Sequence, residues 1–151
     1  MSEDLKNKIN ELLPEAVFDE TGQWLNLLID CKQWADLSLK LRMNEELLFD
    51  YLFCVTCVDW KTHMSMVYHL ESKKHNFILV VKAKIEDRND PKIESVANIW
   101  RTAEFHEREA YGLFGVKFLN HPDLRRLFLT DEWKGWPLRK DYEDDINMIK
   151  L

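Results

Sequence analysis

The fold is decided by Tyr51-Leu-Phe-Cys-Val-Thr-Cys-Val58, His63-Met-Ser-Met-Val-Tyr-His-Leu70 and Phe77-Ile-Leu-Val-Val-Lys-Ala-Lys-Ile85, three runs rich in β-branched and aromatic residues. The second run alternates, as in a strand with one buried face, and places these apolar side chains on the same side: Met64, Met66, Tyr68 and Leu70. The first run is apolar at both parities, so we expect it to be buried on both faces. A short polar stretch separates the second and third runs and predicts a β-hairpin.

The residues before these runs predict two helices with a hairpin between them. Apolar residues recur at helical spacing within residues 3–13 and again within residues 31–43. Between the two helices, Val17–Asp19 and Trp24–Ile29 have the length and composition of strands, and Thr21-Gly22 marks a turn. The order up to the three runs is therefore helix, strand, strand, helix.

A long helix is predicted after the three runs. From Lys92 the apolar residues recur three and four apart, so the helix would run toward Tyr111, and Gly112 and Gly115 would end it as C-terminal caps. Beyond it no period is sustained. The sequence thus predicts an α+β domain at residues 1–116, with a small open β-sheet covered by helices, and an extended C-terminal arm at residues 117–151 that docks on a partner subunit.

Composition limits the class of protein. At 151 residues, with 46% hydrophobic residues and only four glycines and four prolines, the chain has the composition of one folded domain. A net charge of −6 argues against a nucleic-acid ligand, because phosphate binding needs a basic face. The apolar runs are shorter than the roughly 20 residues of a membrane-spanning helix, and the acidic N-terminus lacks the features of a secretory signal. We expect a cytoplasmic chain whose membrane contact is made only through partners.

Cys54-Val-Thr-Cys57 has the spacing of redox and zinc sites. There is no second pair, however, and Cys31 is distant in the sequence. A catalytic dithiol also needs a helix N-terminus or a similar group to lower a thiol pKa, whereas this pair lies within a strand. Ordinary buried thiols are therefore the favoured interpretation, and a thiol or metal enzyme built on the pair is the alternative.

His106-Glu-Arg-Glu-Ala110 begins like the zinc motif H-E-x-x-H, but Ala110 replaces the second histidine. The remaining histidines share no ligand spacing, and no glycine-rich nucleotide loop is present. We therefore predict no catalytic, cofactor-binding or metal-binding residue in this chain.

The charged triplet Glu107-Arg108-Glu109 has three interpretations: a proton relay, a buried ion-pair hub or a solvated helix face. Composition favours the solvated face. The hub would gain partners if the C-terminal arm folds back, because the arm contains Arg125, Arg126, Arg139 and Lys140.

The C-terminal arm and the segment before it carry Arg, Trp, Phe and Pro in the proportions of a protein interface. Trp100, Trp133 and Trp136 are interpreted as packing residues or as interface anchors, and the sequence leaves both open. Because the segment has too little apolar periodicity to build its own core, we interpret it as laid on a partner.

Three ordered blocks in this region are Trp100-Arg-Thr-Ala-Glu-Phe-His-Glu-Arg-Glu-Ala-Tyr-Gly-Leu-Phe-Gly-Val116, His121-Pro-Asp-Leu-Arg-Arg126 and Trp136-Pro-Leu-Arg-Lys-Asp-Tyr142. Together they closely resemble the signature of the C-type subunit of NADH-quinone oxidoreductase, respiratory complex I. One position departs from the family's pattern, because Gly112 stands where the family usually has aspartate, which removes one carboxylate.

The resemblance implies a non-catalytic structural subunit in the hydrophilic arm of a proton-translocating complex. Such a subunit would dock on the quinone-site (D-type) subunit, beside cluster-bearing neighbours, and would support electron transfer from NADH to quinone. FMN, iron–sulfur clusters, NADH and quinone would be used by other subunits, with no cofactor in this chain. The location implied is the cytoplasmic side of the cell inner membrane, with a plastid or mitochondrial equivalent as the alternative.

The resemblance also assigns the partner interface, to these residues: Glu107, Arg108, Glu109, Tyr111, Gly115, His121, Asp123, Leu124, Arg125, Arg126, Trp136, Pro137, Leu138, Arg139, Lys140 and Asp141. A homologous subunit of a membrane-bound hydrogenase, or of a related cofactor-oxidising complex, is the alternative function.

Overall fold

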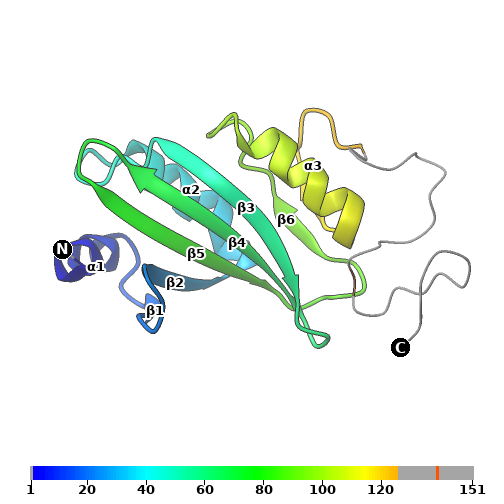
Figure 1. Ribbon diagram of the computed structural model, residues 1–151, viewed down its shortest axis with the longest axis horizontal. Helices are drawn as coiled ribbons and strands as arrows, with labels where there is room; N and C mark the ends of the chain where they lie inside the picture. Colours follow the sequence, from blue (N-terminus) through cyan, green and yellow to red (C-terminus); the bar gives the residue numbers. More distant parts are fainter. Residues whose placement is uncertain (1, 126–138, 140–151) are drawn as a thin grey trace, which may run out of the picture.

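A five-stranded sheet with helices packed against it forms the centre of the molecule (Figure 1). The computed structural model describes residues 2–125 and Arg139. The elements in chain order are α1 (Ser2–Leu12), β1 (Val17–Asp19), β2 (Leu25–Asp30), the 3-10 turn η1 (Cys31–Gln33), α2 (Trp34–Met43), β3 (Tyr51–Asp59), β4 (Met64–Ser72), β5 (Phe77–Ile85), β6 (Lys92–Glu94), α3 (Ala103–Phe114) and β7 (Lys117–Leu119). The α+β class predicted from the sequence is confirmed.

The strand order in the sheet is β1-β2-β5-β4-β3. Both predicted hairpins are present, since β1 pairs antiparallel with β2 and β4 pairs antiparallel with β5. In contrast, β2 and β5 are parallel. Parallel neighbours need a crossover connection, and here the connection includes α2. The strand that follows β2 in the sequence, β3, lies at the far edge of the sheet.

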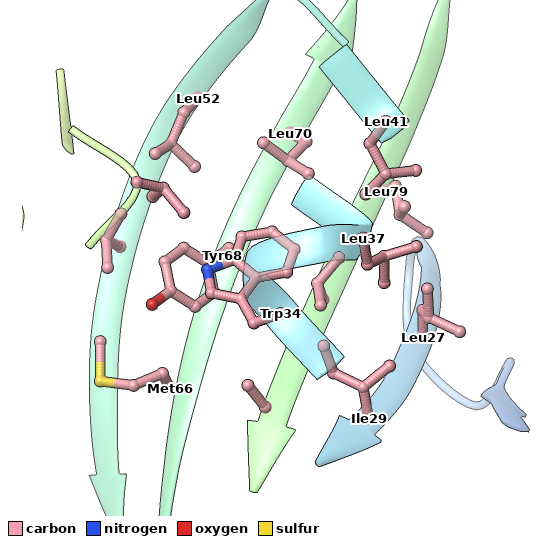
Figure 2. Close-up of a cluster of buried hydrophobic side chains, with 14 of the residues drawn as sticks. Leu27, Ile29, Trp34, Leu37, Leu41, Leu52, Met66, Tyr68, Leu70 and Leu79 are labelled. Carbon is pink, nitrogen blue, oxygen red and sulfur yellow. The ribbon is translucent and has the colours of Figure 1, made fainter. Parts of the chain in front are cut away.

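The hydrophobic core lies between α2 and one face of the sheet (Figure 2). Trp34, Leu37 and Leu41 point from α2 toward the strands, and the Trp34 and Tyr68 rings are 4.4 Å apart between their centroids. The side chains from β4 that face this helix are the alternating set predicted from the sequence, all fully buried: Met64, Met66, Tyr68 and Leu70. Because the core covers this face of β4, its apolar side chains alternate along the sequence, and this alternation predicted the strand.

The burial predicted for β3 is wrong. Its buried side chains alternate, with Val55, Cys57 and Asp59 on the covered face, whereas Thr56 is exposed. The reason is that no helix within residues 2–125 covers the opposite face of the sheet (Figure 1). The apolar residues at the other parity therefore lie on a partly open surface.

The long helix predicted from Lys92 is also wrong in its first half. Lys92–Glu94 is a strand, β6, and a series of tight turns connects it to α3, which begins only at Ala103. In these turns the amide groups of Ile99 and Trp100 both donate to the carbonyl of Val96. Consecutive turns bury one side chain in every three or four, so the apolar spacing imitates a continuous helix.

The two glycines have different roles. Gly112 lies inside α3, so its predicted role as a helix cap is wrong. Gly115 does end the helix, with φ of 81° and its amide donating to the carbonyl of Tyr111 at 2.9 Å. This left-handed conformation is strained for residues with a side chain and explains the glycine at that position.

The chain remains attached to the domain after Val116. β7 pairs in parallel with β6, and the amide of Ser95 donates to the carbonyl of Leu119 at 2.9 Å. The division of the chain at residues 116 and 117 stays a prediction, since residues 126–138 and 140–151 lie outside the described part. None of the helices described is long and apolar enough to cross a membrane.

Candidate functional site

α3 contains most of the first signature block. The three residues of its charged triplet, Glu107, Arg108 and Glu109, differ in how far they are exposed. Glu107 is 0% exposed and Arg108 is 7% exposed, while Glu109 is exposed. The solvated-face interpretation is therefore wrong for two of the three residues. Successive residues on a helix point about 100° apart, so the triplet spans about 200° and its last member, Glu109, faces solvent while the first two are buried.

The Glu107 carboxylate is held by the segment between β6 and α3. It accepts hydrogen bonds from Ser95 Oγ at 2.6 Å and from the Val96 amide at 2.9 Å. Burial raises the pKa of Glu107 to about 7, although these two hydrogen bonds oppose the rise; the nearby charge of Glu94 adds to it. The carboxylate thus ties α3 to β6 from inside the domain.

His121, in the second block, is the next member of this buried group. Its Nε2 lies 3.7 Å from Glu107 Oε1, and both side chains are 0% exposed. Its Nδ1 accepts a hydrogen bond from the Asp123 amide at 3.0 Å, and Nε2 lies 3.1 Å from the Glu104 carbonyl. Because an amide can only donate and a carbonyl can only accept, these partners assign the proton to Nε2.

Two arginines connect α3 to the chain that follows β7. Arg108 donates from Nε to the carbonyl of Arg125 at 3.3 Å, and its guanidinium lies 5.8 Å from the centroid of the Phe105 ring. Arg139, from the third block, donates from Nε to the carbonyl of Phe114 at 2.8 Å. A cation at the carboxyl end of a helix is favoured by the helix dipole, so Arg139 suits this position.

A buried ion pair lies next to Arg139. Arg139 Nη2 also donates to the carbonyl of Arg88. The Arg88 guanidinium in turn donates two hydrogen bonds to the Asp59 carboxylate, from Nε to Oδ1 at 2.8 Å and from Nη2 to Oδ2 at 2.6 Å. The Asp59 side chain is 1% exposed and that of Arg88 is 14% exposed. These contacts link the third block to the end of β3 through the loop after β5.

The structure thus separates the predicted interface residues into groups. Glu107, Arg108 and the His121 side chain are inside the domain; Tyr111, Leu124 and Arg139 are partly buried; and Glu109, Asp123 and Arg125 are exposed. The following predicted residues lie outside the described part: Arg126, Trp136, Pro137, Leu138, Lys140 and Asp141. Trp100 is 3% exposed and donates from Nε1 to the Phe49 carbonyl at 2.8 Å, so it is a packing residue, while Trp133 also lies outside.

Sequence reasoning missed Ser95, Asp59 and Arg88. For Asp59 a signal was available, because it is in phase with the buried Val55 and Cys57 on β3. A carboxylate on a buried face needs a cationic or hydrogen-bonding partner, which predicts an ion pair.

The geometry of Cys54 and Cys57 disfavours a thiol or metal site. Side chains three residues apart on a strand point to opposite faces, and Cys57 is buried while Cys54 is half-buried. Burial raises the pKa of Cys57 to about 12, with the charge of Asp59 adding to the rise and Arg139 opposing it. Burial also raises the pKa of Cys54. Both thiols are protonated at neutral pH, and within residues 2–125 and Arg139 no three His, Cys, Asp or Glu side chains form a metal-binding group.

Comparison with known proteins gives a consistent family match. Residues 27–146 match the family described as "Respiratory-chain NADH dehydrogenase, 30 Kd subunit". The C-type subunit of NADH-quinone oxidoreductase from Chlorobium phaeobacteroides is 40% identical over 144 residues, covering 92% of this chain and 84% of the relative. The C-type subunit of F(420)H(2) dehydrogenase from Methanosarcina mazei is 45% identical over 144 residues, covering 93% of this chain and 89% of the relative.

A longer relative and two solved structures extend the match. The combined C/D-type subunit of NADH-quinone oxidoreductase from Phocaeicola vulgatus is 43% identical over 124 residues, which are 82% of this chain but only 24% of the relative. The chain therefore spans about a quarter of that protein. A chain of the membrane-bound sulfane sulfur reductase, an archaeal respiratory membrane complex, has a TM-score of 0.79 at 24% identity, covering 94% of this chain and 85% of that chain. The trypsin-resistant fragment of Nqo5 has a TM-score of 0.67 at 23% identity, covering 80% and 98%, and these two structures support the fold.

Proposed function

Because the chain belongs to the family of the 30 kDa subunit of respiratory-chain NADH dehydrogenase, we propose that it is a non-catalytic structural subunit in the hydrophilic arm of a quinone-reducing respiratory complex. In this proposal it docks on the quinone-site (D-type) subunit, beside cluster-bearing subunits, on the cytoplasmic side of the cell membrane. FMN, iron–sulfur clusters, NADH and quinone are used by the other subunits. The name of the Phocaeicola vulgatus relative joins the C-type and D-type parts in one polypeptide, which supports adjacency of the two.

One observation carries the proposal: one residue of each signature block, Glu107, His121 and Arg139, binds the chain to itself. Glu107 ties α3 to β6, His121 ties α3 to the chain after β7, and Arg139 ties the end of α3 to the loop after β5. These contacts fix the start of the C-terminal arm, which begins at residue 117, against the domain. The exposed residues around it, including Phe105 at 61% exposure and Glu109, are then available to a partner.

Two described groups in this region whose pKa is raised by burial support a structural role. Cys57 is protonated at neutral pH, because burial raises its pKa to about 12. Glu107 does titrate near neutrality, but its side chain is 0% exposed and is bonded to Ser95 and Val96. Neither group is placed to meet a substrate from solvent.

Co-purification with the D-type subunit tests the docking role. The full chain and a chain ending at Arg125 are each co-expressed with that subunit. We place the end at Arg125 because an end at Val116 would remove β7 and the buried His121. The full chain is expected to co-purify with the D-type subunit and the shortened chain to lose most of this binding. Thermal unfolding of the shortened chain alone serves as the control for its fold. Equal co-purification would refute the C-terminal arm as the dock.

A second candidate function follows from the 45% identity to the Methanosarcina mazei subunit. In this candidate the chain serves the same structural role in a complex that oxidises F420H2 in place of NADH. Purification of the native complex followed by assays with each electron donor separates the two. Activity with NADH alone supports the first candidate, and activity with reduced F420 alone supports the second. Turnover of either donor by the isolated chain would refute a non-catalytic role.

A further inference from the structure

The turn between β3 and β4 carries an unusually exposed tryptophan. Trp60 is 58% exposed, whereas Trp34 and Trp100 are 0% and 3% exposed. Figure 1 shows that this turn projects past the end of the sheet. A large aromatic side chain at a protruding turn adds little to the core of its own domain, but it suits the centre of a protein interface.

Hydrogen bonds fix the backbone of this turn, and the His63 ring lies beside the indole. The Trp60 amide donates to the His63 carbonyl at 3.0 Å, and the Lys61 amide donates to Asp59 Oδ1 at 2.9 Å. The Trp60 and His63 rings are stacked, with their centroids 6.4 Å apart and their planes 24° apart. A side chain that is ordered before binding loses less entropy when a partner buries it.

The same turn is connected to the third signature block. Asp59, which directly precedes Trp60, is gripped by the Arg88 guanidinium, and the Arg88 carbonyl accepts a hydrogen bond from Arg139. The chain of contacts therefore runs from Trp60 through one buried ion pair to the block proposed to dock on the D-type subunit. Trp60 and Arg139 are thereby placed on one continuous end of the domain.

We infer that Trp60 is an anchor of the interface with the D-type subunit, where it enters an apolar pocket that also offers an acceptor for the indole N–H. The inference rests on the proposed function, because it takes the partner from there. It adds a contact from the β3–β4 turn, at a position outside the signature blocks. Because Trp60 is 58% exposed, such a pocket would newly bury about 90–145 Å² of the roughly 150–250 Å² that a fully buried aromatic side chain removes from solvent.

Affinity measurements on the full chain and the purified D-type subunit test this inference. Trp60→Ala is expected to raise the Kd about 10- to 30-fold, as loss of an aromatic hot spot does, and Trp60→Phe is expected to raise it less. Met43→Ala is the matched control, because Met43 is 68% exposed at the end of α2, and its Kd is expected to equal that of the wild type. Thermal unfolding of each variant checks its fold.

Hydroxyl-radical footprinting of the wild-type complex gives a second readout that needs no variant. Oxidation of Trp60 is expected to fall on binding. Two results would overturn this inference while leaving the proposed function intact. One is an unchanged Kd for Trp60→Ala. The other is unchanged oxidation of Trp60 on binding, when the full chain forms the complex and the chain ending at Arg125 does not. A wild-type chain that does not bind the D-type subunit would overturn the proposed function and this inference with it. Protection of Trp60 by self-association alone would overturn it too.

Discussion

Replacement of Glu107 by glutamine should remove a pH dependence from the stability of the domain. Glutamine has nearly the same size but cannot ionise. Its side-chain oxygen can still accept the hydrogen bond from the Val96 amide, and its NH2 group can donate to the hydroxyl oxygen of Ser95. In the wild type, burial raises the pKa of Glu107 from 4.5 to about 7. The other titratable groups that face this carboxylate are Glu94, His121 and Tyr68.

The magnitude follows from proton linkage. Between pH 4.5 and 7 the unfolded chain releases the Glu107 proton while the folded chain keeps it. Because the folded pKa lies above the unfolded pKa, the stabilising contribution of the protonated group is complete below the unfolded value and is lost as the pH rises through the folded value. At about 1.4 kcal/mol per pKa unit, the rise from 4.5 to about 7 corresponds to a loss of about 3 kcal/mol.

Urea unfolding at a series of pH values from 4.5 to 8.5, followed by far-UV circular dichroism, measures this loss. The difference in unfolding free energy, wild type minus Glu107→Gln, should fall by about 3 kcal/mol across this range and become flat above about pH 8. Titrating groups that do not interact with Glu107 are present in both proteins and cancel in the difference. Glu109→Gln, a change at the exposed neighbour, should follow the wild type. A difference that stays constant with pH would refute the assigned pKa and its cause.

Three further changes test other parts of the structure. Gly115→Ala should lower the unfolding free energy by about 1 kcal/mol, because φ is 81° at this position, and thermal unfolding that matches the wild type would contradict this. Asp59→Asn should destabilise the domain by about 3 kcal/mol in urea unfolding, since it removes the buried carboxylate that pairs with the Arg88 guanidinium; an unchanged unfolding midpoint would argue against the ion pair. Replacement of Cys54 and Cys57 by alanine should leave the activity of the assembled complex intact, and lost activity in a normally assembled complex would revive the thiol interpretation.

The sequence predicted the elements whose burial follows one clear period. The alternation in residues 64–70 indicated a strand with one face on the core, and the helical spacing before Pro14 indicated α1. The helix predicted from Lys92 was wrong in its first half, because a strand and a set of turns bury residues there at the spacing of a helix. Gly112 and Gly115 both resembled caps, and only the backbone conformation distinguishes them.

The candidate site was less readable from the sequence, because its contacts join distant segments. The burial of Glu107 depends on Ser95, which follows β6, and on His121, which follows β7. Composition treats such a glutamate as a surface residue, since most glutamates are exposed. The family resemblance named these residues as a group, but it carried no information on which of them face inward.

Because β2 pairs in parallel with β5, the sheet cannot form early during synthesis on the ribosome. β2 pairs through Leu25–Asp30 with Leu79–Lys84, so the edge of β2 that pairs with β5 has no neighbour until residues 79–84 have been synthesised. Until then its apolar side chains are available to other nascent chains, which is the condition that chaperones guard against. Truncated products that stop before Phe77 should therefore aggregate, whereas products that extend through Ile85 can close the sheet.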